Sequence, residues 1–408
     1  SPMAETWHPA VFSRSIGLGR VIVWAYDLAS SVALTRQGNP AWVNQERDGR
    51  EGIRAVDSFV DWVDLERLSI PQADVQMRFL SRLMTDLLAD QYPLPRIWYF
   101  PEAVKTVFIV TGDSHQSPAW AIDEVFRTVE KYGGTMTVYY TPPPSTSLLK
   151  RVARRARMWV YRLPVIGKPL RKNYYHPLPD QVSAWRKRGH EFALHPFVEE
   201  GLEVGWEQYW EQFTGLGFGP VPPTVRTHQV LWQGWVETAR LQATYGIRLN
   251  LDYYPYGPAL KKENGEWAYG YLTGSGLAMK FIDKQGRLLN INQQLTQLLD
   301  EQVIKMPWGL GGANIGGQAG AEVAKELLER SLREFPAAIC GQFHVDPFAI
   351  GGELAEEEKK FLEGTLMYAK ANGIPIISAN KWLEFLSWRR ELTINDVKFN
   401  ERESKLQI

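Results

Sequence analysis

The stretch Lys105-Thr-Val-Phe-Ile-Val-Thr-Gly-Asp-Ser-His-Gln116 decides the fold. Its apolar and β-branched run, residues 106–110, predicts a short strand buried on both faces, and a Thr-Gly turn signal ends that run. Asp113 and His115 follow directly. Because α/β folds hold ligands at the carboxyl ends of their strands, this carboxylate and imidazole are placed for chemistry. The alternative is that Asp113 caps the next helix while His115 faces water.

Strands and helices alternate along the chain beyond this stretch. The pattern predicts further strands at 135–140, 189–196, 225–230, 247–252, 304–307, 338–344 and 374–378, and helices at 119–132, 178–187, 319–334 and 353–372. A strand, helix, strand order with short connections is the βαβ unit of a parallel sheet, so the chain is predicted to be α/β.

Ionisable residues recur where the predicted strands end. They are Asp113, His195, His228, Asp252 and His344. One histidine at a strand end is ordinarily a hydrogen-bonded polar residue. Several that converge on one rim of a parallel barrel indicate an active site.

The composition narrows the classes of function. Lys plus Arg and Asp plus Glu number 46 each among 408 residues, so the zero net charge gives no support for a nucleic-acid partner. The 16 Trp and 17 Tyr suggest aromatic-lined clefts that bind sugars, although Trp also fills cores. The single Cys340 excludes an internal disulfide. No apolar run reaches the roughly 18 to 20 residues that span a bilayer, and the N-terminus lacks a signal-peptide pattern.

Two other segments have distinctive composition. Residues 148–172 form a basic amphipathic insertion, which is either a solvated helix or a contact with a membrane surface or polyanion. Residues 308–317 are rich in glycine but lack the Gly-Lys-Ser/Thr ending of a phosphate-binding loop, so a mobile rim loop is predicted.

The order of these motifs resembles the polysaccharide deacetylase family of carbohydrate esterases. The similar segments, over roughly residues 100 to 390, are 105–114 (the family's T-F-D-D motif), Gly189 to His195 (G-H-E-I-x-x-H), Val225-Arg226 with Trp232 and Trp235 (the arginine and tryptophan motif), Leu251-Asp252-Tyr253 (D-S-x-x-W), and Gln342-Phe-His344. The resemblance implies a divergent member of that family.

This resemblance also implies a fold and a domain division. The family fold is a deformed, incomplete (β/α) barrel, which we expect at residues 99–392. Residues 1–98 are then a small N-terminal α/β segment or the end of a larger domain. Residues 393–408 are a C-terminal tail or the start of a further domain.

The resemblance implies metal-dependent removal of an acetyl group, as amide or ester, from a carbohydrate. In the family, an Asp and two His hold a divalent metal that polarises the carbonyl and activates a water; a second Asp takes the water proton and a last His protonates the leaving group. Such ligands suit Zn²⁺. An acetylated glycan partner and an extracytoplasmic location are implied in the same way.

Two departures bear on the metal. The family's T-F-D-D becomes Thr-Gly-Asp-Ser, so only Asp113 survives; if it is the base, then Ser114 replaces the metal aspartate. Glu199 stands where the family has its second histidine. The metal site is therefore either rebuilt or lost.

A rebuilt site assigns roles residue by residue. Asp113, His195 and His228 are the expected metal ligands, Asp252 or Glu199 the general base, and His344 the general acid. Arg226 is expected to anchor a catalytic carboxylate, or else to form a packing salt bridge. The expected substrate contacts are His115, which is also a spare candidate for ligand or base, and Trp232, Trp235, Tyr253 and Tyr254.

Two other functions fit the same sequence. A catalytically inactive barrel that retains its aromatic mouth would bind carbohydrate without a metal. A hydrolase of small amides would have a closed pocket instead of an open groove.

Overall fold

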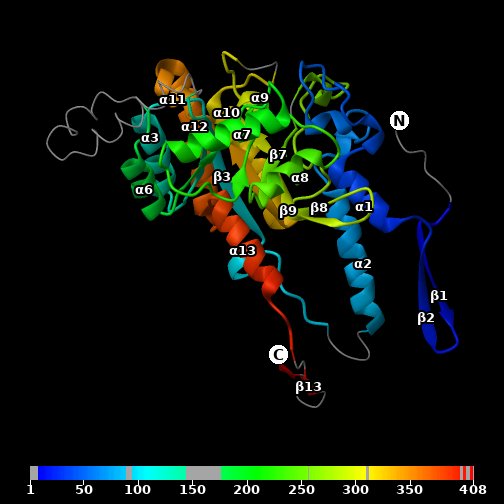
Figure 1. Ribbon diagram of the computed structural model, residues 1–408. Coiled ribbons are helices and arrows are strands. Elements are labelled where there is room, and N and C mark those ends of the chain that lie inside the picture. Colours follow the sequence, from blue (N-terminus) through cyan, green and yellow to red (C-terminus); the bar gives the residue numbers. More distant parts are fainter. Residues whose placement is uncertain are drawn as a thin grey trace, which may run out of the picture.

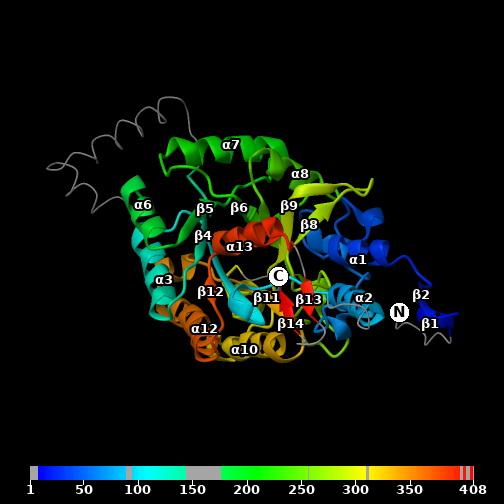
Figure 2. The ribbon, with the colours of Figure 1, turned by 90° about the horizontal axis from the view of Figure 1, so that it is seen from below.

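The computed structural model describes residues 8–88, 94–143, 176–255, 257–308, 312–395, 398–400 and 405–407. The predicted basic insertion at 148–172 lies outside these ranges. Helices surround a core of two sheets (Figures 1 and 2).

The larger sheet is parallel throughout. Its strands are β3 (Thr106–Ser114), β4 (Thr137–Tyr140), β5 (Glu191–Leu194), β10 (Leu298–Leu299), β11 (Ala337–Gln342) and β12 (Ile376–Ile377). They are ordered β10-β11-β3-β4-β5, and β12 pairs with the first half of β3. The central strand β3 is buried along its whole length, as its apolar run predicts.

The smaller sheet continues the curve of the larger one. It is ordered β6 (Thr224–Val225), β7 (Leu249–Tyr253), β9 (Leu288–Leu295) and β8 (Met279–Ile282), with only the β8–β9 pair antiparallel. The amide of Thr296 donates to the Tyr253 carbonyl and that of Gln297 to the Cys340 carbonyl, which joins the sheets between β9 and β10. The two sheets also meet at their other ends, where the His228 amide, after β6, donates to the Pro196 carbonyl, after β5, at 2.9 Å. The predicted α/β class and deformed, incomplete barrel are confirmed.

The helices cover the outside of this barrel (Figure 2). They are α3 (Ala119–Lys131), α6 (Pro179–Lys187), α7 (Leu202–Gly215), α8 (Glu237–Thr244), α10 (Gly317–Arg333) and α12 (Gly352–Ala371), with the short α9 (Asp300–Val303) and α11 (Asp346–Ile350) between strands and outer helices. In α3, Ile122, Val125 and Val129 recur at helical spacing and are fully buried. The last helix, α13 (Ala379–Glu391), lies across the lower side of the barrel in Figure 1.

The N-terminal residues pack onto the barrel. They form α1 (Leu28–Gln37), α2 (Gln72–Leu88) and the 3-10 turns η1 (Pro40–Trp42), η2 (Ala55–Ser58) and η3 (Leu65–Arg67); η4 (Pro101–Ala103), η5 (His228–Val230) and η6 (Pro258–Leu260) come later. The buried Asp74 of α2 accepts hydrogen bonds from the Ser275 hydroxyl and the Gly276 amide. Buried polar bonds of this kind fix the segment to the rest of the molecule.

Two small strand pairs lie outside the two sheets. At the N-terminus, β1 (Val11–Ile16) and β2 (Gly19–Trp24) make an antiparallel hairpin that projects from the body (Figure 1), and Gly17 turns the chain between them with a φ of 59°. Another small pair, β13 (Lys398–Asn400) with β14 (Lys405–Gln407), follows α13.

Two strands predicted inside the barrel need correction. The strand expected at 225–230 stops after Val225, and His228 lies in the 3-10 turn η5, where Gln229 has a φ of 52°. The strand expected at 304–307 is a single bridge between Ile304 and Ile315, whereas the unpredicted β9 supplies the neighbour of β7.

Gly112 is expected to be intolerant of any side chain. A Cβ there would stand 2.3 Å from the Phe343 carbonyl oxygen and 2.7 Å from the Met136 methyl carbon. We expect Gly112→Ala to lower the free energy of unfolding by about 2 kcal/mol, measured by urea denaturation. The control is Gly215→Ala at the end of α7, where nothing lies within 4 Å and stability should not fall. Equal stability of the two variants would contradict the close approach of β3 and β11.

Candidate active site

Four histidines gather at the carboxyl ends of the parallel strands. His115 follows β3, His195 follows β5, His228 lies in the turn after β6, and His344 follows β11. The ring centre of His115 lies 5.2 Å from that of His195, 5.1 Å from His228 and 5.5 Å from His344, and His195 and His228 are 5.6 Å apart. The fold thus brings His115 and His344, which are 229 positions apart in the sequence, into one cluster.

Each ring is held through its Nδ1 atom by an acceptor that cannot donate. The partners are the Asp346 carboxylate at 2.8 Å for His115, the Arg226 carbonyl at 2.8 Å for His195, the Glu199 carboxylate for His228, and the Asp300 carboxylate at 2.9 Å for His344. Nδ1 must therefore carry the proton in each ring. This arrangement leaves Nε2 as the metal-binding or proton-transferring atom, as in many histidine metal sites.

The surroundings shift the pKa values of His195, His228 and His344 in different directions. Burial lowers the pKa of His195 well below its usual value, and the neighbouring His115 and His228 lower it further. Burial also lowers the pKa of His228, although its hydrogen bond to Glu199 opposes this. For His344, burial favours the neutral form, but Asp300 and Glu301 raise its pKa well above the usual value. The site therefore combines the neutral imidazoles of His195 and His228 with an imidazolium at His344.

Asp113 lies beside the cluster, and two side chains donate hydrogen bonds to its carboxylate. Arg226 donates to its Oδ1 at 3.1 Å, and the side-chain amide of Gln342 donates to its Oδ2 at 2.9 Å. That Oδ2 lies 3.9 Å from the Nε2 of His195. Arg226 is fully buried and also donates to the hydroxyls of Thr111 and Thr296, so it links β3 to the end of β9. Arg226 therefore pairs with the Asp113 carboxylate, an arrangement that fits both an anchored catalytic carboxylate and a packing salt bridge.

Asp252 lies behind this site, with its oxygens already occupied. It accepts from the Thr227 amide at 2.7 Å, the Thr227 hydroxyl at 3.1 Å, Gln242 at 3.0 Å and Asn250 at 2.6 Å. These bonds fix the backbone just before His228. Asp252 is therefore engaged in positioning the chain, and these donors take up the oxygens that a general base would need.

We expect Asp252→Asn to act on stability. An amide in place of one oxygen would point a donor at the donors of Gln242 or Asn250, which should lower the free energy of unfolding by about 2 kcal/mol. Urea denaturation measures this, and the exposed Asp86→Asn serves as control. A variant of normal stability that had lost its hydrolytic rate would instead make Asp252 a catalytic base.

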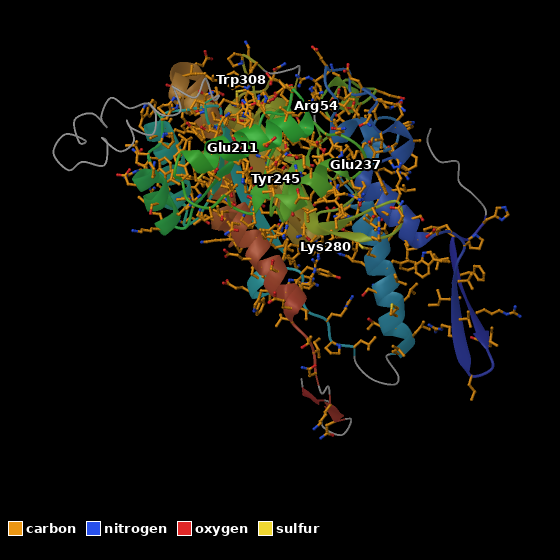
Figure 3. The ribbon with its side chains drawn as sticks, in the orientation of Figure 1. Arg54, Glu211, Glu237, Tyr245, Lys280 and Trp308 are labelled. Carbon is orange, nitrogen blue, oxygen red and sulfur yellow. The ribbon has the colours of Figure 1, made fainter. Side chains whose placement is uncertain are left out.

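The N-terminal segment holds the turn that carries His228. The buried Arg54 donates through Nε to the Gln229 carbonyl at 3.1 Å and is paired with Asp48 at 3.3 Å. The Trp232 amide donates to the Ile53 carbonyl at 2.8 Å. Arg54 and Trp308, both labelled in Figure 3, lie toward the upper side of that view, where the strands end.

The aromatic residues expected at the mouth are mostly in the core. Trp232 packs on Phe281 with stacked rings and edge-on against Tyr253. Trp235, Tyr253 and Tyr254 are buried as well, with 7%, 1% and 7% of their surfaces exposed. None of the four offers an open face to a sugar, because core packing covers their rings. Two other aromatic residues border the histidines: Phe197 stacks on His228 with ring centres 3.6 Å apart, and Trp308 lies 6.1 Å from His344.

The sequence did not single out several carboxylates of the site. Asp300 and Glu301 flank His344, Glu358 lies near Asp300, and Asp346 holds His115. The position of Asp346, two residues after His344, could have indicated that it belongs to the site. No sequence pattern indicated Asp300, because the strand before it, β10, is only two residues long.

The cluster differs from a finished metal site. Among the described residues, no group of three or more His, Cys, Asp or Glu side chains is placed so that it could hold a metal ion as it stands. The spacing of the histidines nevertheless fits a metal ion. An ion held by three imidazole Nε2 atoms at about 2.1 Å in tetrahedral directions places their ring centres roughly 5 Å apart. The rings of His115, His195 and His228 have that spacing.

Within the described ranges, no helix is both long and apolar enough to cross a bilayer.

Comparison with known proteins gives matches in structure alone. No protein-family model matches the sequence, and no curated protein matches it. Among solved structures, the chain is similar to the Bacillus subtilis peptidoglycan deacetylase PdaC, with 11% identity, a TM-score of 0.28, and 70% of this chain and 93% of that one covered. It is similar to the peptidoglycan N-acetylglucosamine deacetylase Bc1960, with 9% identity, a TM-score of 0.34, and 69% and 89% covered. A Thermococcus litoralis 4-alpha-glucanotransferase matches with 15% identity, a TM-score of 0.41, and 69% and 40% covered.

Proposed function

We propose that the protein is a metal-dependent hydrolase that removes an acetyl group, as amide or ester, from a carbohydrate. The observation that carries this is the cluster of His115, His195 and His228, each fixed through Nδ1, beside an Asp113 gripped by Arg226. The order of sequence motifs, which resembles that of polysaccharide deacetylases, supports the reaction class.

The metal would be held by the Nε2 atoms of His115, His195 and His228. His115 replaces Asp113 in the set expected from the sequence, because Asp113 is already engaged by Arg226 and Gln342. Neutral imidazoles suit Zn²⁺ or a similar borderline cation. When bound, such an ion supplies an ionisable water and stabilises charge on the acetyl oxygen.

The remaining steps belong to side chains of this chain. Asp113 takes the proton from the attacking water, in the position that Arg226 and Gln342 hold for it. The water oxygen bonds to the acetyl carbon, and the bond from that carbon to the sugar nitrogen or oxygen breaks. His344 gives its Nε2 proton to that leaving atom, in the place where Glu301 now meets it at 3.1 Å. Glu199 is then the carboxylate that orients His228.

The proposal is tested by metal content and acetate release together. The purified protein is expected to bind about one equivalent of zinc and to release acetate from acetylated amino sugars or sugar esters, and chelator should remove both properties. Asp113→Asn should keep the metal and lose the activity, because its carboxylate acts as base. Loss of the metal in that variant would return Asp113 to the ligand set.

A carbohydrate-binding protein without catalysis is the second candidate, since Glu199 and Ser114 depart from the deacetylase motifs. This second function predicts that the protein still binds sugar after a chelator has been added, and that it releases no acetate from any substrate. The extracytoplasmic location implied by the sequence resemblance stays a prediction.

A further inference from the structure

Glu358 is a buried carboxyl group that the reaction described above does not use. It lies on α12 with none of its surface exposed. Both carboxyl oxygens are buried, and no donor reaches either of them. A carboxylate without any hydrogen-bond donor is very costly inside a protein, so this position calls for an explanation.

The neighbour of Glu358 supplies that explanation. Its carboxyl group lies within hydrogen-bonding reach of the fully buried Asp300. Asp300 already accepts from the His344 amide, the His344 ring and the Glu301 amide. Two facing buried carboxyl groups do not both ionise, and the one with several donors keeps the charge.

We propose that Glu358 is a neutral carboxylic acid that donates its proton as a hydrogen bond to Asp300 and thereby positions Asp300 against His344. The row Glu358, Asp300, His344 then runs from α12 to the site. This inference rests on the proposed function for its catalytic meaning but not for its chemistry, since the protonation of Glu358 is a property of the fold.

The charges around Glu358 agree with this assignment. Burial and the negative charge of Asp300 raise the pKa of Glu358 well above its usual value, and His344 opposes that rise. Glu301 is a further charged group near it, and it raises the pKa as well. For a carboxyl whose pKa is raised by folding, stability is present at low pH and is lost as the pH rises above the ordinary value of 4.5 toward the folded-state value.

The extra hydrogen bond has a consequence for His344. A carboxylate that accepts one more donor is a weaker base and is held in one orientation. Asp300 therefore holds the His344 ring in place but attracts the Nδ1 proton of that ring less strongly. Glu358 acts through Asp300, so it is a positioning residue.

Two substitutions of Glu358 distinguish the effect of its hydrogen-bond donor from the effect of its size. Glu358→Gln keeps a donor for Asp300 on a side chain of nearly equal size, and Glu358→Leu removes the donor. We expect Glu358→Gln to keep kcat within about threefold, and Glu358→Leu to lower kcat about tenfold or more. The exposed Glu356→Gln on the same helix is the matched control.

Spectroscopy tests the inference without any substrate. The infrared spectrum of the wild type at pH 8 should contain a carbonyl band of a protonated carboxylic acid that is absent from Glu358→Gln and present in Glu356→Gln. Thermal unfolding from pH 5 to 9 should show stability that declines with pH more steeply in the wild type than in Glu358→Gln.

Absence of that band, or equal pH slopes in the wild type and Glu358→Gln, would overturn the proposal, even if Glu358→Leu fails to fold. If band and slope are as expected but no acetyl substrate is hydrolysed, the protonated Glu358 stands and the proposed function fails.

Discussion

His195→Ala is expected to lose the bound metal and to reduce acetate release by about 10³-fold or more, equivalent to about 4 kcal/mol of transition-state stabilisation. His195 is buried, and its Nδ1 donates to the Arg226 carbonyl, so its Nε2 is the atom that faces Asp113. Its low pKa keeps that nitrogen unprotonated at neutral pH, as a ligand must be. Elemental analysis and an acetate assay on the same samples measure both effects.

The control for this experiment is His8→Gln, because His8 is exposed and remote in sequence from the strand ends. It should retain one equivalent of metal and full activity. A His195→Ala protein that still carried one equivalent of metal would remove His195 from the ligand set. Metal-free wild type, even after incubation with zinc, would end the metal-dependent mechanism and favour the sugar-binding alternative.

Arg226→Met is expected to destabilise the fold by about 3–5 kcal/mol, since removal of one partner leaves Asp113 as an uncompensated charge in a buried place. The guanidinium also donates to the hydroxyls of Thr111 and Thr296, so β3 and the residue after β9 lose a common donor. Urea denaturation followed by tryptophan fluorescence gives the change in unfolding free energy.

Two comparison variants sharpen this result. Arg226→Lys keeps the charge without the planar fork, so its loss should fall between the wild type and Arg226→Met. Arg248→Met removes a partly buried arginine whose bonds go only to backbone carbonyls of Ala243 and Ile247, and it should cost about 1 kcal/mol. If Arg226→Met cost no more than Arg248→Met, the buried pair with Asp113 would contribute nothing to stability.

The parts of the fold with a regular pattern could be predicted from the sequence. The apolar run of β3, the helical spacing of α3 and α12 and the histidines after β5 and β11 all lie close to where the pattern indicates. These features depend on local periodicity and on strand ends meeting at one rim, which are general properties of parallel sheets.

The rest could not be predicted, because it depends on partners distant in sequence. Asp300 acquires its role only through His344, 44 positions later, and Glu358 only through Asp300. His228 was expected on a strand, yet a 3-10 turn held by Arg54 and Asp252 brings it to the site. Tryptophan and tyrosine near a strand end do not reveal which face of the chain they occupy, and Trp232 and Tyr253 turn inward.

The pairing of β3 sets the order in which this molecule can fold. Its neighbours β11 and β12 lie more than two hundred residues later in the chain, so most of the pairing around β3 cannot form until those residues have left the ribosome. Closing such long loops is slow compared with making helices. The newly made chain therefore exposes one edge of its most apolar strand for much of synthesis, and chaperone dependence and slow refolding should follow from its topology.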